Sequence, residues 1–95
     1  MKIVVTIIGQ DRVGIVARAA ALLAERSINI LDINQNIVHG FFNMVLIAEM
    51  TSEAGDGKAG GGLRGVQEAF REMGTEMDLD IKVQHEDIFL AMHKV

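Results

Sequence analysis

The stretch IVVTIIGQDRVGIVARAAALLAER, residues 3–26, changes from a strand pattern to a helical pattern around two glycines. Residues 3–8 are β-branched throughout, which is typical of a buried strand. Residues 9–14 have the composition of a turn. Residues 13–26 predict a helix, because apolar side chains recur there at helical spacing. Its predicted apolar stripe contains Val16, Ala20 and Leu23, widened by Ile15, Ala19 and Leu22.

The turn has the features of a helix start. Asp11 is predicted as the N-cap, whose carboxylate accepts hydrogen bonds from the free N–H groups of the first turn. Gly14 has no side chain, so a neighbouring group can approach its backbone. The same N–H groups can hold an anion such as a carboxylate. The turn is therefore either a purely structural cap or part of a ligand site, in which Asp11 would receive an ammonium group.

Residues 28–50 predict two further strands joined by a tight turn at His39-Gly40. The first of them, residues 28–38, changes the phase of its apolar positions after Ile30, which indicates a bulge. Three residues with poor strand propensity also lie in it: Asn29, Asp32 and Gln35. These side chains either keep an exposed edge polar against aggregation or line a ligand site beside the first turn.

The C-terminal half predicts a loop, a helix, a strand and a short final helix. Residues 52–62 hold five of the ten glycines and predict a loop. One face of the next helix is formed by Leu63, Val66, Phe70, Met73 and Met77. Residues 79–84 alternate as a strand, with Leu79, Ile81 and Val83 directed inward. Residues 86–94 predict the final helix, capped by Glu86 or Asp87 and with apolar contacts from Ile88, Phe89 and Met92.

This order of elements predicts an α+β, ferredoxin-like βαββαβ fold. It has a four-stranded antiparallel sheet with two helices on one face, plus a short C-terminal helix. The first and third strands are expected at the centre, because both are apolar on two faces. The 95 residues form one domain, with a core over residues 1–85 and a helical tail over residues 86–95.

Composition excludes several classes of function. The net charge of −4 provides no basic footprint for nucleic acid, and there is no Trp or Tyr for base stacking. The absence of Cys excludes disulfides and thiolate chemistry. No apolar run is long enough to span a membrane and no signal-peptide pattern is present, so we expect a cytoplasmic protein without nucleic-acid or membrane partners.

Several short motifs suggest chemistry that their context does not support. Gly55-x-Gly57-x-x-Gly60 matches a dinucleotide-binding pattern but lacks the doubly wound parallel sheet that this use requires. Gly57-Lys58 lacks the remainder of a phosphate loop. His39-Gly40-Phe41-Phe42 resembles a strand motif of RNA-binding domains, but Asn43 replaces its second stacking aromatic residue.

Catalytic and metal sites find equally little support. His85, Glu86, Asp87 and His93 could approach one another around the final helix, but eight residues between histidines is not a recognised zinc spacing. Ser27 and Ser52 lie in no nucleophile motif. We therefore expect a protein that is not an enzyme, with no catalytic residues, metal or cofactor.

The segment from Gly9 to Val16 resembles the first strand–helix turn of ACT domains. Residues 23–30 resemble the end of that helix and the second strand of the same family, and Phe42, Met44 and Leu46 lie where it has its third-strand core. The likeness is greatest to short, stand-alone ACT proteins of unassigned function. It implies regulation of a partner protein through binding of an amino acid or a related small metabolite at an interface between domains. Two residues depart from the family pattern: Val13 replaces a common proline, and Gly9 replaces a side-chain donor.

The resemblance implies a ligand site at the turn, in which the position of Asn29 contacts ligand and a second subunit closes the site. The candidate site residues are Gly9, Gln10, Asp11, Gly14, Ile15, Val16 and Asn29. An alternative is an ACT domain that dimerises or binds a partner without any ligand. Gly9 and Val13 favour this alternative, whereas Asn29 and the spacing of Asp11 and Gly14 favour ligand binding.

A homodimer is expected from the second face of the predicted sheet. Five residues should lie away from the helices and form an apolar patch: Val4, Thr6, Ile8, Val45 and Ile47. A patch of this kind is large for a monomer to expose. The final helix is too short to be stable alone, so we expect it to take part in the same association.

Overall fold

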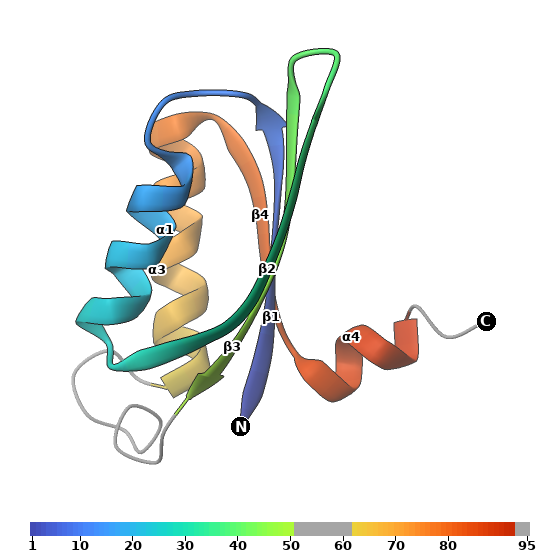
Figure 1. Ribbon diagram of the computed structural model, residues 1–95. Coiled ribbons are helices and arrows are strands. Elements are labelled where there is room, and N and C mark those ends of the chain that lie inside the picture. Colours follow the sequence, from blue (N-terminus) through green and yellow to red (C-terminus); the bar gives the residue numbers. More distant parts are fainter. Residues whose placement is uncertain (51–61, 93–95) are drawn as a thin grey trace.

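The computed structural model describes residues 1–50 and 62–92, which form one four-stranded antiparallel sheet with helices on both sides (Figure 1). The strands are β1 (Lys2–Gln10), β2 (Ile28–Val38), β3 (Phe41–Met50) and β4 (Leu79–His85). Their order across the sheet is β2-β3-β1-β4. The apolar first and third strands are therefore central, as predicted.

Three helices complete the described fold. α1 (Ile15–Glu25) and α3 (Gly62–Met77) cover one face of the sheet, and α4 (Glu86–Met92) lies on the other side (Figure 1). An ion pair 2.5 Å long joins Arg18 Nη2 to Glu76 Oε1 across the two packed helices. The predicted ferredoxin-like arrangement is confirmed. The glycine motifs at 55–60 and His93 lie outside the described residues.

The main core lies between the sheet and the pair α1 and α3. Ile3, Val5 and Ile7 of β1 are fully buried against the helices, because alternate residues of a strand share a face. In α1 the buried positions are Ile15, Ala19 and Leu23. All three belong to the predicted stripe, but its centre lies at Ile15 and Ala19, whereas Val16 and Leu22 are only partly buried.

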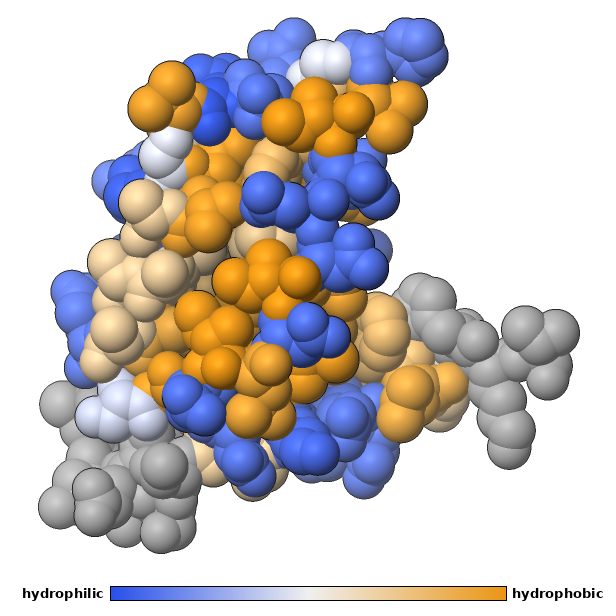
Figure 2. Space-filling model, viewed as in Figure 1, coloured by the Kyte–Doolittle hydropathy of each residue, from blue (hydrophilic) through white to orange (hydrophobic). Residues whose placement is uncertain are grey.

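The hairpin of β2 and β3 follows the predicted boundaries. Its two-residue turn, His39-Gly40, has positive φ at both positions, as a type I′ turn requires. The register shifts between Ile30 and Asp32, which confirms the predicted bulge. β2 is an edge strand, and its exposed apolar side chains contribute to the apolar surface in Figure 2: Leu31, Ile33, Ile37 and Val38.

A close approach between α3 and β4 explains Gly74. The residue is buried, and a Cβ atom there would lie 2.8 Å from the carbonyl oxygen of Leu79. The low helix propensity of glycine near the end of α3 is therefore offset by closer packing of the helix on the strand.

The start of α4 differs from its prediction. The helix begins at Glu86, so His85 precedes it, and the Asp87 amide donates a 3.1 Å hydrogen bond to His85 Nδ1. The ring of His85 therefore supplies the cap that was expected from Glu86 or Asp87. Within residues 1–50 and 62–92, no helix is long and apolar enough to cross a membrane.

Candidate functional site

Most of the predicted site residues lie in the turn between β1 and α1, at the end of β1 or at the start of α1. After Gln10 the chain leaves the sheet, and the Asp11 amide donates a 2.9 Å hydrogen bond to the Gly40 carbonyl at the tip of the β2–β3 hairpin. Gln10, Asp11 and Val13 are exposed. Ile15 then enters the core and anchors the helix. The structure therefore holds the turn at both ends and exposes it in the middle.

Asp11 is not the N-cap of α1, contrary to the prediction. The cap is Gly14, whose carbonyl accepts the Arg18 amide at 2.8 Å, and no side chain caps the helix. Asp11 lies three positions before this cap, which is too early in the chain for its carboxylate to occupy the N-cap position. The first-turn N–H groups therefore have no side-chain acceptor in the described structure, and Asp11 does not compete for them.

Gly14 has a backbone conformation that favours glycine. Its φ is +92°, and no atom lies within 4 Å of the place where a Cβ would stand. The sequence alone predicts that Gly14→Val abolishes ligand binding through its bulk and leaves the fold mostly intact. A β-branched residue is strained at this φ whatever the surrounding space, so Gly14→Val would also cost stability and would not test binding alone. The space beside Gly14 is nevertheless open.

Gly9 has a packing role. A Cβ at this position would lie 2.6 Å from Leu79 Cδ2 and 3.4 Å from the Asp78 carbonyl oxygen. The side chain that this position lacks would therefore meet the start of β4. This contact gives a structural reason for glycine where amino-acid-binding ACT domains often carry a donor.

Asn29 lies at the other end of the sheet from the turn. It pairs with Glu49, which pairs with Lys2 at the start of β1, whereas Gly9 lies seven residues further along β1. That separation is roughly 23 Å at the usual rise per strand residue. The order of elements predicts this separation, because α1 runs back along the sheet and β2 then begins at the end where β1 begins. A single chain therefore does not bring Asn29 to the turn.

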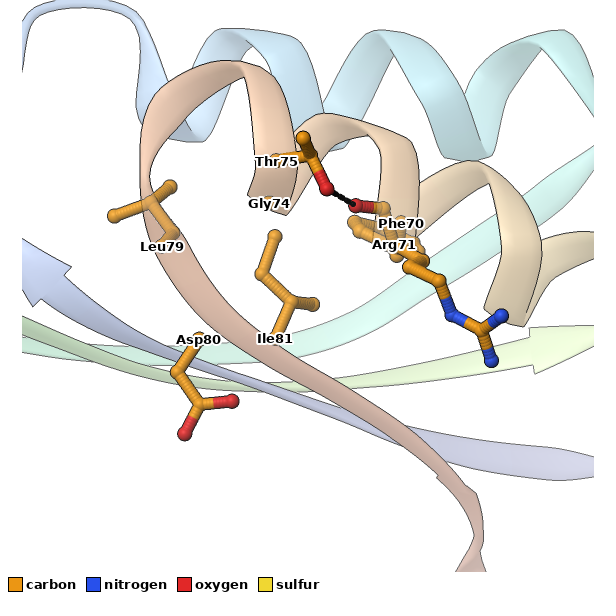
Figure 3. Close-up of a pocket in the computed structure, with 7 residues that line it drawn as sticks. All are labelled: Phe70, Arg71, Gly74, Thr75, Leu79, Asp80 and Ile81. Carbon is orange, nitrogen blue, oxygen red and sulfur yellow. Dashed lines mark hydrogen bonds between the residues drawn. The ribbon is translucent and has the colours of Figure 1, made fainter.

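Two hollows lie along α3 and β4, away from the turn. The first, of about 270 Å³, lies beside Gly74 and Leu79 (Figure 3), and the second, of about 290 Å³, extends toward Gln67 and Val83. Their polar groups do not converge. In Figure 3 Asp80 is directed away from α3. The Thr75 hydroxyl donates to the Arg71 carbonyl, and Gln67 Nε2 donates to the Val83 carbonyl. The turn remains the better candidate site.

Comparison with known proteins identifies the class. Residues 1–84 match the family model described as the ACT domain, so the chain belongs to the ACT domain family. It is 37% identical over 95 residues to a UPF0237 protein of Clostridium perfringens, with all of both chains covered. These relatives are short proteins like this one, as the resemblance implied.

Solved structures agree with this assignment. The fold is similar to that of an ACT domain protein from Streptococcus pneumoniae, with a TM-score of 0.74, 29% identity, and 94% of this chain and 93% of that chain covered. The regulatory subunit of aspartate kinase from Thermus thermophilus shares the fold, with a TM-score of 0.62 and 23% identity over 87% of this chain and 49% of that chain. ACT domains are typically ligand-sensing and regulatory modules.

Proposed function

We propose that this ACT domain is a homodimeric, non-catalytic regulatory module that senses an amino acid or a related small metabolite at the β1–α1 turn. The observation that carries the proposal is the open, uncapped turn at Gly14 in a chain that matches the ACT family over residues 1–84. A carboxylate would accept from the first-turn N–H groups of α1.

The exposed carboxylate of Asp11 supports a zwitterionic ligand. Within the described part of the chain it makes no ion pair, and it follows β1 directly at the base of the turn. An ammonium group would find its charge partner there, while the ligand carboxylate meets the start of α1. A regulated partner protein would then respond to the occupied state.

The position of Asn29 favours a site shared between two subunits. Because Asn29 lies at the opposite end of the sheet, it reaches a turn only from a second copy of the chain. Asn29→Ala is expected to weaken ligand binding by about 0.5–1.5 kcal/mol, the contribution of one neutral hydrogen bond.

Mixing two defective variants tests this sharing. Gly14→Asn subunits have a blocked turn and an intact Asn29, whereas Asn29→Ala subunits have the reverse. If the site is shared, the mixed dimer regains one complete site and binds with the parental affinity. If each site lies within one chain, mixing restores nothing, and Asn29 has no role in trans.

A thermal-shift screen of the twenty amino acids tests the proposal as a whole. A ligand that binds only the folded protein stabilises it by about 2.7 kcal/mol at a concentration one hundred times its Kd. A reproducible rise in melting temperature with one or a few amino acids is expected. Failure of all amino acids and related metabolites to stabilise the protein would contradict ligand sensing.

The alternative is an interaction module that associates without ligand. The exposed apolar side chains of edge strand β2 favour it, since an unpaired apolar edge is suited to strand addition by another chain (Figure 2). The same screen separates the two functions, because this alternative predicts assembly with no response to small molecules.

A further inference from the structure

The second face of the sheet is covered at one end only. Register places Val4, Thr6 and Ile8 of β1 on this face, opposite Ile47, Val45 and Asn43 of β3. Val4 is 2% exposed, although it lies outside the core beneath α1 and α3. α4 contacts β1 and β4 on this side of the sheet, at the end where Val4 pairs with Gln84 (Figure 1).

The other end of this face is open, and exposed apolar side chains lie there beside polar ones, since Asn43 is opposite Ile8 and Asn34 is opposite Val45. Ile8 is 49% exposed, Val45 39% and Phe41 54%, and Val38 lies directly opposite Phe41. We call Ile8, Val38, Phe41 and Val45 the open patch. It lies at the end of β1 that leads into the ligand turn, whereas α4 follows β4 at the end where β1 begins.

α4 has apolar side chains that its own chain leaves uncovered. Phe89 is half-buried, but Ile88 and Leu90 on either side of it are 54% and 56% exposed. Asp87 and Ala91, four residues apart on the polar side, are exposed as well. A helix of seven residues is not stable in isolation, so the flanks of α4 need a further surface.

We infer that two copies of this chain form a dimer in which the α4 of each subunit docks on the open patch of the other subunit. Both surfaces lie on one face at opposite ends, so a single two-fold axis perpendicular to the strands brings each α4 to the other copy's patch. Such an isologous contact closes with two subunits. The inference rests on the homodimer of the proposed function.

The same arrangement bears on the ligand site. By register Asn29 belongs to the second face, since it lies opposite Glu49 and alternates with the inward Ile28. Asn29 and α4 lie at one end of the sheet, and the β1–α1 turn lies at the other. The two-fold axis that exchanges α4 therefore places the Asn29 end of each sheet near the turn end of the partner sheet. The dimer contact then lies next to the proposed ligand site at the β1–α1 turn, so ligand binding would change the association of the subunits.

Cysteine cross-linking tests the inference directly, because the chain has no cysteine of its own. Leu90→Cys and Phe41→Cys are introduced together and oxidised. Within one chain the two sites lie at opposite ends of the face, too far apart for the Cα separation that a disulfide requires. We expect roughly tenfold more covalent dimer from the pair than from either single variant. A control pair, Leu90→Cys with Ala21→Cys on the outer side of α1, should give no such gain.

Charge substitution provides the second measurement. Ile88→Glu with Leu90→Glu should raise the dimer Kd roughly a hundredfold in sedimentation equilibrium, because charges cannot be buried unpaired. Ala91→Glu adds a charge to the polar side and should leave the Kd unchanged. If the variant with Ile88→Glu and Leu90→Glu dimerises with the parental Kd, and the cysteine pair gives no specific cross-link, the docking of α4 is overturned but the homodimer is not. A parent protein that is monomeric at micromolar concentration would overturn the homodimer itself.

Discussion

At the scale of single residues, Gly74 is the position where packing overrides local preference. Alanine is favoured over glycine by about 1 kcal/mol inside a helix. At Gly74, however, a Cβ would stand 2.8 Å from the Leu79 carbonyl, and a backbone atom cannot rotate away. We expect Gly74→Ala to lower the free energy of unfolding by about 1–3 kcal/mol in denaturant titrations. Thr75→Ala, on the exposed side of the same helix, is the control and should change stability by less than about 0.5 kcal/mol.

At Ser27, in contrast, a substitution is expected to raise the free energy of unfolding. It follows α1 with φ +59°, and its amide donates a 3.0 Å hydrogen bond to the Ala24 carbonyl. Glycine adopts this left-handed conformation without the steric penalty of a Cβ. Ser27→Gly should therefore raise the free energy of unfolding by about 0.5–1 kcal/mol. Ser27→Ala retains the Cβ and removes only the hydroxyl group. If the alanine variant were stabilised equally, backbone conformation would not be the cause.

At the scale of elements, α4 depends on its cap. His85 Nδ1 accepts a hydrogen bond from the Asp87 amide, and α4 has only seven residues. We expect His85→Ala to destabilise the helix by about 1 kcal/mol, seen as faster hydrogen exchange at the Asp87 amide. Asp87→Asn keeps both the ring and the amide. Its exchange should remain close to that of the parent, and equal acceleration in the two variants would show that the cap is unimportant.

The elements themselves were largely predictable from residue patterns. The β-branched run of β1, the phase change at the bulge in β2 and the three-and-four spacing of α3 each identified an element whose existence the structure confirms. Their central or edge positions followed from which strands are apolar on both faces. These features were predictable because they depend on side chains close together in the chain.

The site was less predictable because its geometry depends on distant contacts. Acidic residues near a helix start are common caps, so the sequence favours Asp11 over Gly14, whose role depends on its positive φ. Asn29 was placed beside the turn by resemblance, although the directions of β1 and α1 put it at the other end of the sheet. The close approach at Gly74 is a contact between α3 and β4, so the spacing of residues within either element does not predict it.

At the scale of the whole molecule, the two faces of the sheet differ in how they are covered. One face is sealed by α1 and α3 and contains the main core. The other is covered by α4 at one end and is open toward the β1–α1 turn. An ACT domain of this size has little interior to spare for a ligand cavity, so a site at a turn closed by a second subunit is consistent with its dimensions.

Calorimetric titration of the amino acid selected by the thermal-shift screen tests the central claim most directly. Gly14→Asn places a side chain in the open space beside the turn, and asparagine tolerates a positive φ. Gly40→Asn is the matched control, at φ +82° with equally open surroundings on the hairpin. The account predicts that Gly14→Asn weakens binding roughly tenfold or more while Gly40→Asn retains the parental affinity. Equal affinities of the parent and Gly14→Asn would contradict it and place the ligand elsewhere.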